Sequence, residues 1–142
     1  MSIETNKATV RRMLEQVWNE RRVDLIDEFF TEDIVSHVVG FPSSSGLEDT
    51  RVGLVMSLNA FPDLKISIDD EIAEADKVVF SWTSRGTHQG ELYGIPPTGK
   101  QVTNTGMTIY RLVNTKIAEL WFIGDNMGMM QQLGVVPALG KA

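Results

Sequence analysis

Apolar residues recur at helical spacing in the first third of the chain. Within residues 5–20 they form one stripe, made up of Val10, Leu14, Val17 and Trp18. Thr5 stands at the start of this stretch and belongs to the residue types that cap helices by accepting a backbone hydrogen bond. The pattern therefore predicts a first helix that begins near Thr5 and buries this stripe.

Two further helices are expected before residue 61. The first covers residues 23–30 and turns inward Leu25, Ile26, Phe29 and Phe30. The second covers roughly residues 47–60 and contributes to the core Val52, Val55, Met56 and Leu58. Between them lie the short apolar run IVSHVV and the loop GFPSSSG. This loop is rich in glycine, serine and proline, but it is too short to link two domains.

From Phe61 onward the apolar residues alternate, as they do in strands. Residues 64–90 hold two alternating runs separated by the turn-like sequence EADK, and KQVTNTGMTIYRL and KIAELWFIG form two more, joined at VNT. The sequence YGIPPTGKQ must reverse the chain between the two pairs. A last short helix is expected over NMGMMQQLG, ended by Gly134 and Pro137.

Helices followed by a run of antiparallel strands predict an α+β fold. A strongly twisted sheet of this kind can curl around the early helices. We therefore expect N-terminal helices packed in a strongly curved, mainly antiparallel sheet, which forms a cone-shaped α+β barrel with a hydrophobic pocket. A chain of 142 residues is an ordinary size for one domain, so residues 1–142 are expected to form a single domain.

Composition and charge narrow the classes of function. A net charge of -6 argues against nucleic acid or an anionic membrane as the main partner. The absence of cysteine excludes disulfides, zinc–thiolate sites and a cysteine nucleophile. No apolar stretch approaches the ~20 residues that a membrane helix needs, and the first residues lack the apolar core of a secretory signal. We therefore expect a soluble, cytoplasmic protein.

Alternation along the strands sorts the candidates for chemistry by face. His88 shares a face with Trp82 and Phe80 on the strand that follows EADK. His37 ends an apolar run beside a loop, where pocket lining and plain packing are equally expected. Two isolated histidines do not make a metal site, and a buried, hydrogen-bonded imidazole is the ordinary interpretation of His88.

On the last strand, alternation places Glu119 and Trp121 on the same face as Asp125. A β-bulge would reverse this assignment, and Gly124 is a natural place for one. Asp125 itself has two interpretations. As a carboxyl desolvated beside tryptophan and methionine it suits general acid–base catalysis, and as the residue before the last helix it suits an N-cap. Glu119 is either a second pocket acid or an ion-paired surface residue.

Several motifs that would point elsewhere are missing. No serine lies in a G-x-S-x-G turn, so a serine hydrolase has no support. G-x-G-x-x-G and G-x-x-x-x-G-K-[ST] are both absent, which counts against a nucleotide cofactor. We therefore expect neither a cofactor nor a metal.

Four short motifs occur in a characteristic order and spacing: FPD at 61–63, RGTHQG at 85–90, GIPPTGK at 94–100 and QQLG at 131–134. With them the sequence resembles the SnoaL-like polyketide cyclase family, small proteins of the nuclear-transport-factor-2-like fold. The resemblance runs from the first helix to Pro137. It implies a cofactor-free enzyme that closes the last ring of an aromatic polyketide ester by an intramolecular aldol reaction, and a homodimer.

In cyclases of this family, an aspartate after the E-x-W of the last strand is the acid–base catalyst. That position falls on Asp125, with Glu119 and Trp121 preceding it. The resemblance thus implies Asp125 as the catalyst. The expected pocket residues are His37, Trp82, His88, Glu119 and Trp121.

The sequence departs from the family pattern in one respect. Cyclases bring a histidine into the pocket from the penultimate strand, whereas this chain has no histidine between residues 89 and 142. Three alternatives to a cyclase or isomerase follow: a hydroxylase-like accessory enzyme of polyketide metabolism, an epoxide hydrolase, and a non-catalytic module for small-molecule binding or dimerisation of the same fold.

Overall fold

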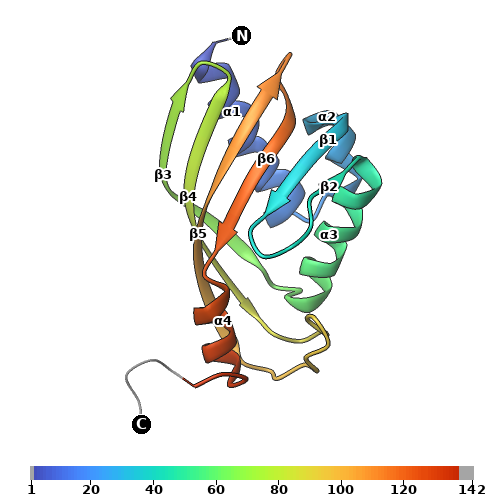
Figure 1. Ribbon diagram of the computed structural model, residues 1–142, viewed down its shortest axis with the longest axis vertical. Helices are drawn as coiled ribbons and strands as arrows, with labels where there is room; N and C mark the ends of the chain where they lie inside the picture. The colour runs from blue at the N-terminus through green and yellow to red at the C-terminus, as the bar shows by residue number, and fades with distance from the viewer. Residues whose placement is uncertain (1, 138–142) are drawn as a thin grey trace.

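A single curved sheet of six strands dominates the structure, a computed structural model that describes residues 2–137 (Figure 1). The strands lie in the order β2-β1-β6-β5-β4-β3. Neighbouring strands run antiparallel, except that β1 and β6 are parallel. The bounds are β1 Phe30–Val38, β2 Ser44–Ser45, β3 Lys65–Glu74, β4 Lys77–Thr87, β5 Gln101–Val113 and β6 Lys116–Gly124.

The helices cover one face and one end of this sheet (Figure 1). The first, α1, continues as a π-helical segment η1, and a 3-10 turn η2 leads into the short α2. The bounds are α1 Ile3–Met13, η1 Leu14–Asn19, η2 Val23–Leu25, α2 Ile26–Phe29, α3 Leu47–Ala60 and α4 Asn126–Leu133. The predicted α+β fold with a strongly curved, mainly antiparallel sheet is confirmed. Among the described residues the sheet stays open, with β2 and β3 as its edges.

The first helix begins earlier than its sequence pattern suggested. Ser2 is the N-cap, and its side chain accepts a hydrogen bond of 3.0 Å from the backbone N–H of Thr5. The prediction of Thr5 as the cap is therefore wrong, because Thr5 lies inside the helix and its backbone N–H is bound by the Ser2 cap. The apolar stripe is confirmed, since Val10, Leu14 and Val17 are buried.

The inward face of α3 also differs from the prediction. Leu54 is 4% exposed and packs into the core, whereas Val52 and Met56 are 49% and 50% exposed. Val55 is exposed as well, and Leu58 is partly buried. The helix packs along the β1 edge of the sheet rather than over its centre (Figure 1), so only a narrow stripe is covered.

One extra residue in β6 sets which side chains face the helices. Arg111 of β5 pairs with Glu119, but the next residue, Leu112, pairs with Ile117, so Ala118 has no partner on β5. This is a β-bulge, and it reverses the alternation beyond it. The bulge therefore lies at Ala118 and not at Gly124, which pairs regularly with Gly106.

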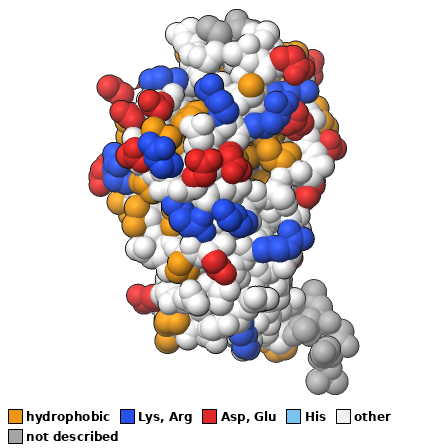
Figure 2. Space-filling model, turned by 180° about the vertical axis from the view of Figure 1, so that it is seen from behind, with side chains coloured by type: hydrophobic (Ala, Val, Ile, Leu, Met, Phe, Trp, Pro, Cys, Tyr) orange, Lys and Arg blue, Asp and Glu red, His pale blue; other side chains and the backbone are white. Residues whose placement is uncertain are grey.

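The face of the molecule opposite to the view of Figure 1 carries mixed charges. Basic and acidic side chains are interspersed there, with apolar side chains scattered among them (Figure 2). No helix within residues 2–137 is both long enough and apolar enough to cross a membrane.

The contact between Gly106 and Trp82 offers a test of the packing. A Cβ at Gly106 would lie 2.3 Å from the Trp82 ring and from the carbonyl oxygen of Ile123, whereas one at Gly53 in α3 meets nothing within 4 Å. We expect Gly106→Ala to lower the free energy of unfolding by about 1–3 kcal/mol. Gly53→Ala should raise it by about 0.5–1 kcal/mol, because alanine favours the helix. Urea unfolding of both variants measures the difference, and a shift of the same sign in both would contradict this packing.

Candidate functional site

A cavity of about 340 Å³ lies between the concave face of the sheet and the helices. Its walls are mostly apolar: Leu14 and Leu54 come from the helical side, and Val102, Leu120 and Phe122 come from β5 and β6. The last two face inward because of the bulge at Ala118. The curvature of the sheet thus leaves a partly open, mostly apolar space of a size suited to a small organic ligand.

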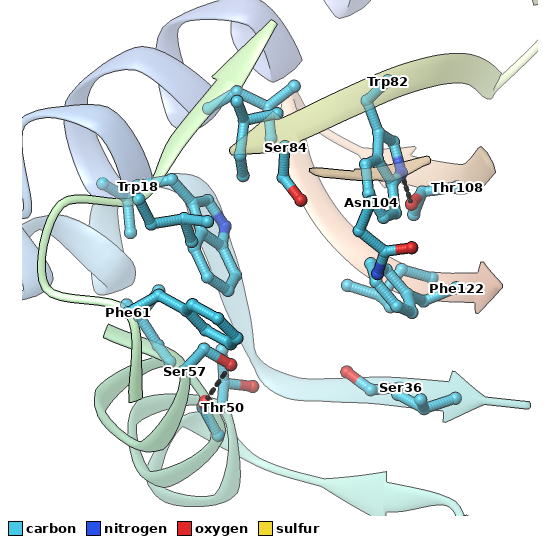
Figure 3. A pocket seen from close by; sticks show the side chains of 18 of the residues that line it. Trp18, Ser36, Thr50, Ser57, Phe61, Trp82, Ser84, Asn104, Thr108 and Phe122 are labelled. Carbon is cyan, nitrogen blue, oxygen red and sulfur yellow. Dashed lines mark hydrogen bonds between the residues drawn. The ribbon is translucent and has the colours of Figure 1, made fainter. Parts of the chain in front are cut away.

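Trp82 lines the cavity beside Asn104 and Thr108 (Figure 3). Its indole covers Gly106, its cross-strand partner on β5, where a side chain would collide with the ring. The indole Nε1–H donates a buried hydrogen bond of 3.0 Å to Thr108 Oγ1. The ring also stacks on Phe122, with centroids 5.2 Å apart. These contacts fix the indole and make it a rigid surface for a ligand.

Most polar groups of the described lining are neutral hydroxyls and amides. Thr50 and Ser57 on α3 donate to the backbone carbonyls of Gly46 and Gly53 at 3.1 and 3.0 Å. Burial raises the pKa of Tyr110, so its hydroxyl stays protonated at neutral pH. The cavity therefore offers hydrogen bonds without charge.

Charged groups are nearly absent from the lining. Among the described residues that line the cavity there is no histidine, lysine or arginine, and Asp49 is the single carboxylate. Asp49 is exposed in the first turn of α3. A ligand in the cavity thus meets one carboxylate and no cation among the described lining residues.

Two aromatic rings meet beside the cavity. Tyr93 lines it from the loop between β4 and β5, and its ring lies 5.2 Å from that of Phe41 in the loop after β1. Tyr93 and Gly94 both have positive φ, 49° and 82°, in a two-residue turn between Leu92 and Ile95. Both rings are largely exposed, so this border of the cavity is apolar.

The structure brings only some of the predicted site residues to the cavity. Trp82 lines it, as described above. His88 is fully buried but is not part of the lining. Its Nδ1 accepts the backbone N–H of Thr98 at 3.2 Å and also lies 3.0 Å from the Thr98 hydroxyl, and its ring lies 5.6 Å from that of Phe61. His88 thus fastens the loop between β4 and β5 to the end of the sheet.

The other predicted pocket residues lie on the outer, convex face. His37 Nε2 and Glu119 Oε2 are 2.7 Å apart, and Arg111 Nε donates to Glu119 Oε1 at 3.1 Å. The ring of Trp121 stacks on His37 with centroids 5.4 Å apart. The expectation that His37, Glu119 and Trp121 line the pocket therefore does not hold, because the bulge at Ala118 turns Glu119 and Trp121 outward.

Asp125 is the N-cap of α4. Its Oδ1 accepts the backbone N–H of Gly128 at 2.8 Å, and the residue is exposed. The side chain is not part of the cavity lining, although the next residue, Asn126, is. The capping role expected for this aspartate is therefore confirmed. Asp125 directly precedes a residue that lines the cavity.

No metal centre is evident in this part of the chain. Within residues 2–137, no three side chains of histidine, cysteine, aspartate or glutamate are grouped closely enough to hold a metal ion.

Three functional candidates on β5 were missed from the sequence: Asn104, Thr108 and Tyr110. They share the inward face of the strand with Val102. The alternation of residues along TNTGMTIYRL is the signal in the sequence that identifies them.

Comparison with known protein families identifies the family of this chain. The sequence profile of the SnoaL-like polyketide cyclases matches residues 8–133, nearly all of the chain. The chain belongs to the SnoaL-like polyketide cyclase family. Among curated protein sequences, none matches it significantly.

Several solved structures are similar to this SnoaL-like chain over most of its length. AclR from Streptomyces galilaeus, a proposed hydroxylase, is 29% identical, with a TM-score of 0.86 over 99% of this chain and 87% of AclR. A proposed polyketide cyclase from Acidithiobacillus ferrooxidans is 28% identical, with a TM-score of 0.85 over 95% and 99%. IdmH from Streptomyces antibioticus, a proposed polyketide cyclase, is 27% identical, with a TM-score of 0.80 over 91% and 98%.

The outer-face contacts of Glu119 predict a pH dependence. Its hydrogen bonds to His37 and Arg111 lower the pKa of Glu119, so the stability that they contribute is present above the ordinary pKa of a glutamate and is lost as the pH falls through the lowered value. Glu119→Gln should unfold at lower urea than the unaltered protein near pH 7. The difference should shrink as the pH falls through the lowered pKa of Glu119, because the carboxylate is then protonated. A difference that stays constant with pH would show that the carboxylate charge contributes nothing.

Proposed function

We propose that this protein is a polyketide cyclase or isomerase-like enzyme, which takes a neutral, largely apolar carbonyl compound into the cavity beside Trp82. The observation that carries the proposal is the mostly apolar cavity, whose described lining holds one exposed carboxylate and no cation, in a chain that matches the cyclase family over residues 8–133. An apolar wall with neutral hydrogen-bonding groups suits a conjugated ketone or ester.

The proposed reaction is an intramolecular aldol closure that needs one acid–base group. A carboxylate takes the α-proton from an activated methylene, and the resulting enolate carbon attacks a ketone carbon of the same molecule. A carbon–carbon bond forms, and the new alkoxide takes the proton back from the carboxyl group. The conjugated carbonyl system holds the negative charge of the enolate, so the protein supplies proton transfer and a dry environment.

We assign the acid–base role to Asp125, as the family pattern implies. In the resting arrangement its carboxylate caps α4 through Gly128, and only the adjacent Asn126 lines the cavity. Catalysis then requires the exposed Asp125 side chain to leave the cap and rotate towards the ligand. That rotation costs about the ~1 kcal/mol of a helix cap, which binding of a ligand can offset.

Asp125→Asn is a clean test of this assignment. Asparagine caps helices about as well as aspartate, so the variant removes the acid–base group while α4 keeps its cap. We expect the rate of cofactor-free cyclisation of polyketide methyl esters and simpler β-keto esters to fall by about 100-fold to 10,000-fold. Thermal unfolding of both proteins checks that the fold is unchanged.

Asp49→Asn is the matched control, because Asp49 is the carboxylate within the lining. Its rate should stay close to that of the unaltered protein. A loss of rate in Asp49→Asn with full activity in Asp125→Asn would overturn the assignment to Asp125. The cyclase proposal itself fails if no ester or β-keto ester is turned over faster than in buffer.

One observation favours a second candidate, a non-catalytic module that binds small molecules. The described lining has no histidine, and its one carboxylate is exposed. Such a module would bind the same ligands without turnover, and Asp125→Asn would bind them equally well. The similarity to AclR at 29% identity supports a third candidate, a hydroxylase-like accessory enzyme, whose activity would require added oxygen and a reductant.

We also propose that the protein pairs through the outer face of its sheet. Met107 and Ile123 are cross-strand partners there, as are Ile109 and Trp121. These four residues form the outer apolar patch. Met107 and Ile123 are 56% and 51% exposed. Contiguous apolar surface of this kind is unusual on a protein that has no partner.

A second copy of the chain is the expected partner of the outer apolar patch. Sedimentation equilibrium should give a dimer for the unaltered protein. Ile123→Lys should shift it towards the monomer, because a dimer would bury the lysine charge. Val52→Lys, on the exposed side of α3, serves as the control and should leave the dimer intact. A monomer at all concentrations would contradict the proposal.

A further inference from the structure

Asn104 is the one side-chain amide that β5 contributes to the cavity lining, and it has a defined orientation. Its Oδ1 accepts the backbone N–H of Thr105 at 3.0 Å. A backbone N–H can only donate, so this bond identifies which end of the amide is the oxygen. The Nδ2 group therefore occupies the other end, above the ring of Phe122 (Figure 3).

No hydrogen bond from Asn104 Nδ2 to any residue between 2 and 137 satisfies this group. The rings of Trp82 and Phe122 lie close to it around Gly124. A Cβ at Gly124 would lie 3.5 Å from Asn104 Nδ2, 3.5 Å from the Trp82 ring and 3.4 Å from the Phe122 ring. A ligand that enters the cavity next to Asn104 therefore meets an amide donor flanked by two aromatic rings, and we call this position the niche.

Three other donors of the lining are already engaged with the protein. Trp82 donates to Thr108, and Thr50 and Ser57 donate to backbone carbonyls of their own helix region. Asn104 Nδ2 is not among the buried polar atoms of the described residues that lack a partner, so it is accessible from the cavity. A ligand oxygen in the niche can accept a hydrogen bond from it in place of water.

The charge of the surroundings selects the kind of oxygen. A carboxylate placed at Asn104 would have no lysine, arginine or histidine of the described lining to pair with. Transfer of an anion from water into the cavity is strongly unfavourable when no counter-ion is present. A ketone or ester carbonyl loses its water at a much lower cost in free energy. The niche thus suits a neutral carbonyl group flanked by a planar, apolar body.

We propose that Asn104 Nδ2 binds a carbonyl oxygen of the ligand and makes the cavity selective for neutral carbonyl compounds over hydrocarbons and carboxylates of the same shape. The inference rests on the proposed function, since it concerns the compound that the cavity takes. Asn104 is a specificity-determining residue in this scheme. The same N–H group also stabilises the oxygen as it gains charge in an enolate.

Three probes of one shape separate the contributions: 2-acetylnaphthalene, 2-ethylnaphthalene and 2-naphthoate. Calorimetric titration measures their dissociation constants with the unaltered protein and with Asn104→Leu, which keeps the size of the side chain but removes the donor. We expect the preference for the ketone over the hydrocarbon to fall by about threefold to tenfold in Asn104→Leu, the effect of one hydrogen bond. Binding of 2-ethylnaphthalene should stay unchanged, and 2-naphthoate should bind weakly to both.

The hydrocarbon probe also detects a variant that has lost its fold, since a collapsed cavity would weaken all ligands. Asn114→Asp, an exposed turn residue, is the control for an altered asparagine elsewhere. It should keep the preference of the unaltered protein. The inference is overturned if Asn104→Leu keeps the same ketone preference, or if 2-naphthoate binds as tightly as 2-acetylnaphthalene.

These outcomes are distinct from those that test the catalytic proposal. Binding that depends on Asn104, together with no turnover of any ester, supports the niche and rejects the cyclase. Turnover that depends on Asp125, together with unchanged ketone preference in Asn104→Leu, supports the cyclase and rejects the niche.

Discussion

The bulge at Ala118 is the constraint on which the chemistry of this protein depends. It inserts one residue opposite the junction of Arg111 and Leu112, and so exchanges the two faces of β6 beyond that point. Leu120 and Phe122 thereby become cavity walls, and an ionisable glutamate is kept out of the interior. Without the bulge, the concave face would carry a carboxylate and the convex face two more large apolar residues.

Most side chains around the cavity carry no charge. Polar groups inside it are neutral, either engaged with the protein, as in the Trp82–Thr108 hydrogen bond, or free for a ligand, as in Asn104. Ionic contacts are found on the convex face around Glu119. In the proposed reaction, proton transfer comes from the edge of the cavity, where Asp125 stands at the start of α4. A mostly neutral interior with an acid at its border suits an apolar substrate that reacts through one acidic C–H group.

Much of the fold was accessible from local patterns in the sequence. The boundaries of β3 to β6 follow from alternation and turn residues, and α3 was located at its observed bounds. The strands β1 and β2 were not predicted: Phe30 was assigned to a helix, and the residues after it to a short apolar run and a loop. The inward residue of α3, Leu54, was not found, because an edge helix buries too narrow a stripe for composition to reveal. Ser2 was overlooked as a cap because both serine and threonine suit the role and only the backbone geometry distinguishes them.

The site was predicted less well, for a physical reason. Trp82 was placed correctly at the cavity because β4 alternates without interruption from Val78 onward. Beyond Ala118 every assignment on β6 was inverted, and a single alanine carries no signal that it is unpaired. Asp125 remains a prediction as a catalyst: the capping pattern and the family pattern fall on the same residue, and sequence cannot separate them.

Gly106 of β5 pairs with Gly124 of β6, yet the two positions differ in the substitutions that they tolerate. Any side chain at Gly106 would strike the Trp82 ring and the backbone, whereas a methyl group at Gly124 would rest at ordinary contact distance from its neighbours. Evolution can therefore remodel the ligand niche by single steps at Gly124 while Gly106 is held by selection for folding. The preferred ligand can therefore change through a substitution in β6 that leaves the sheet intact.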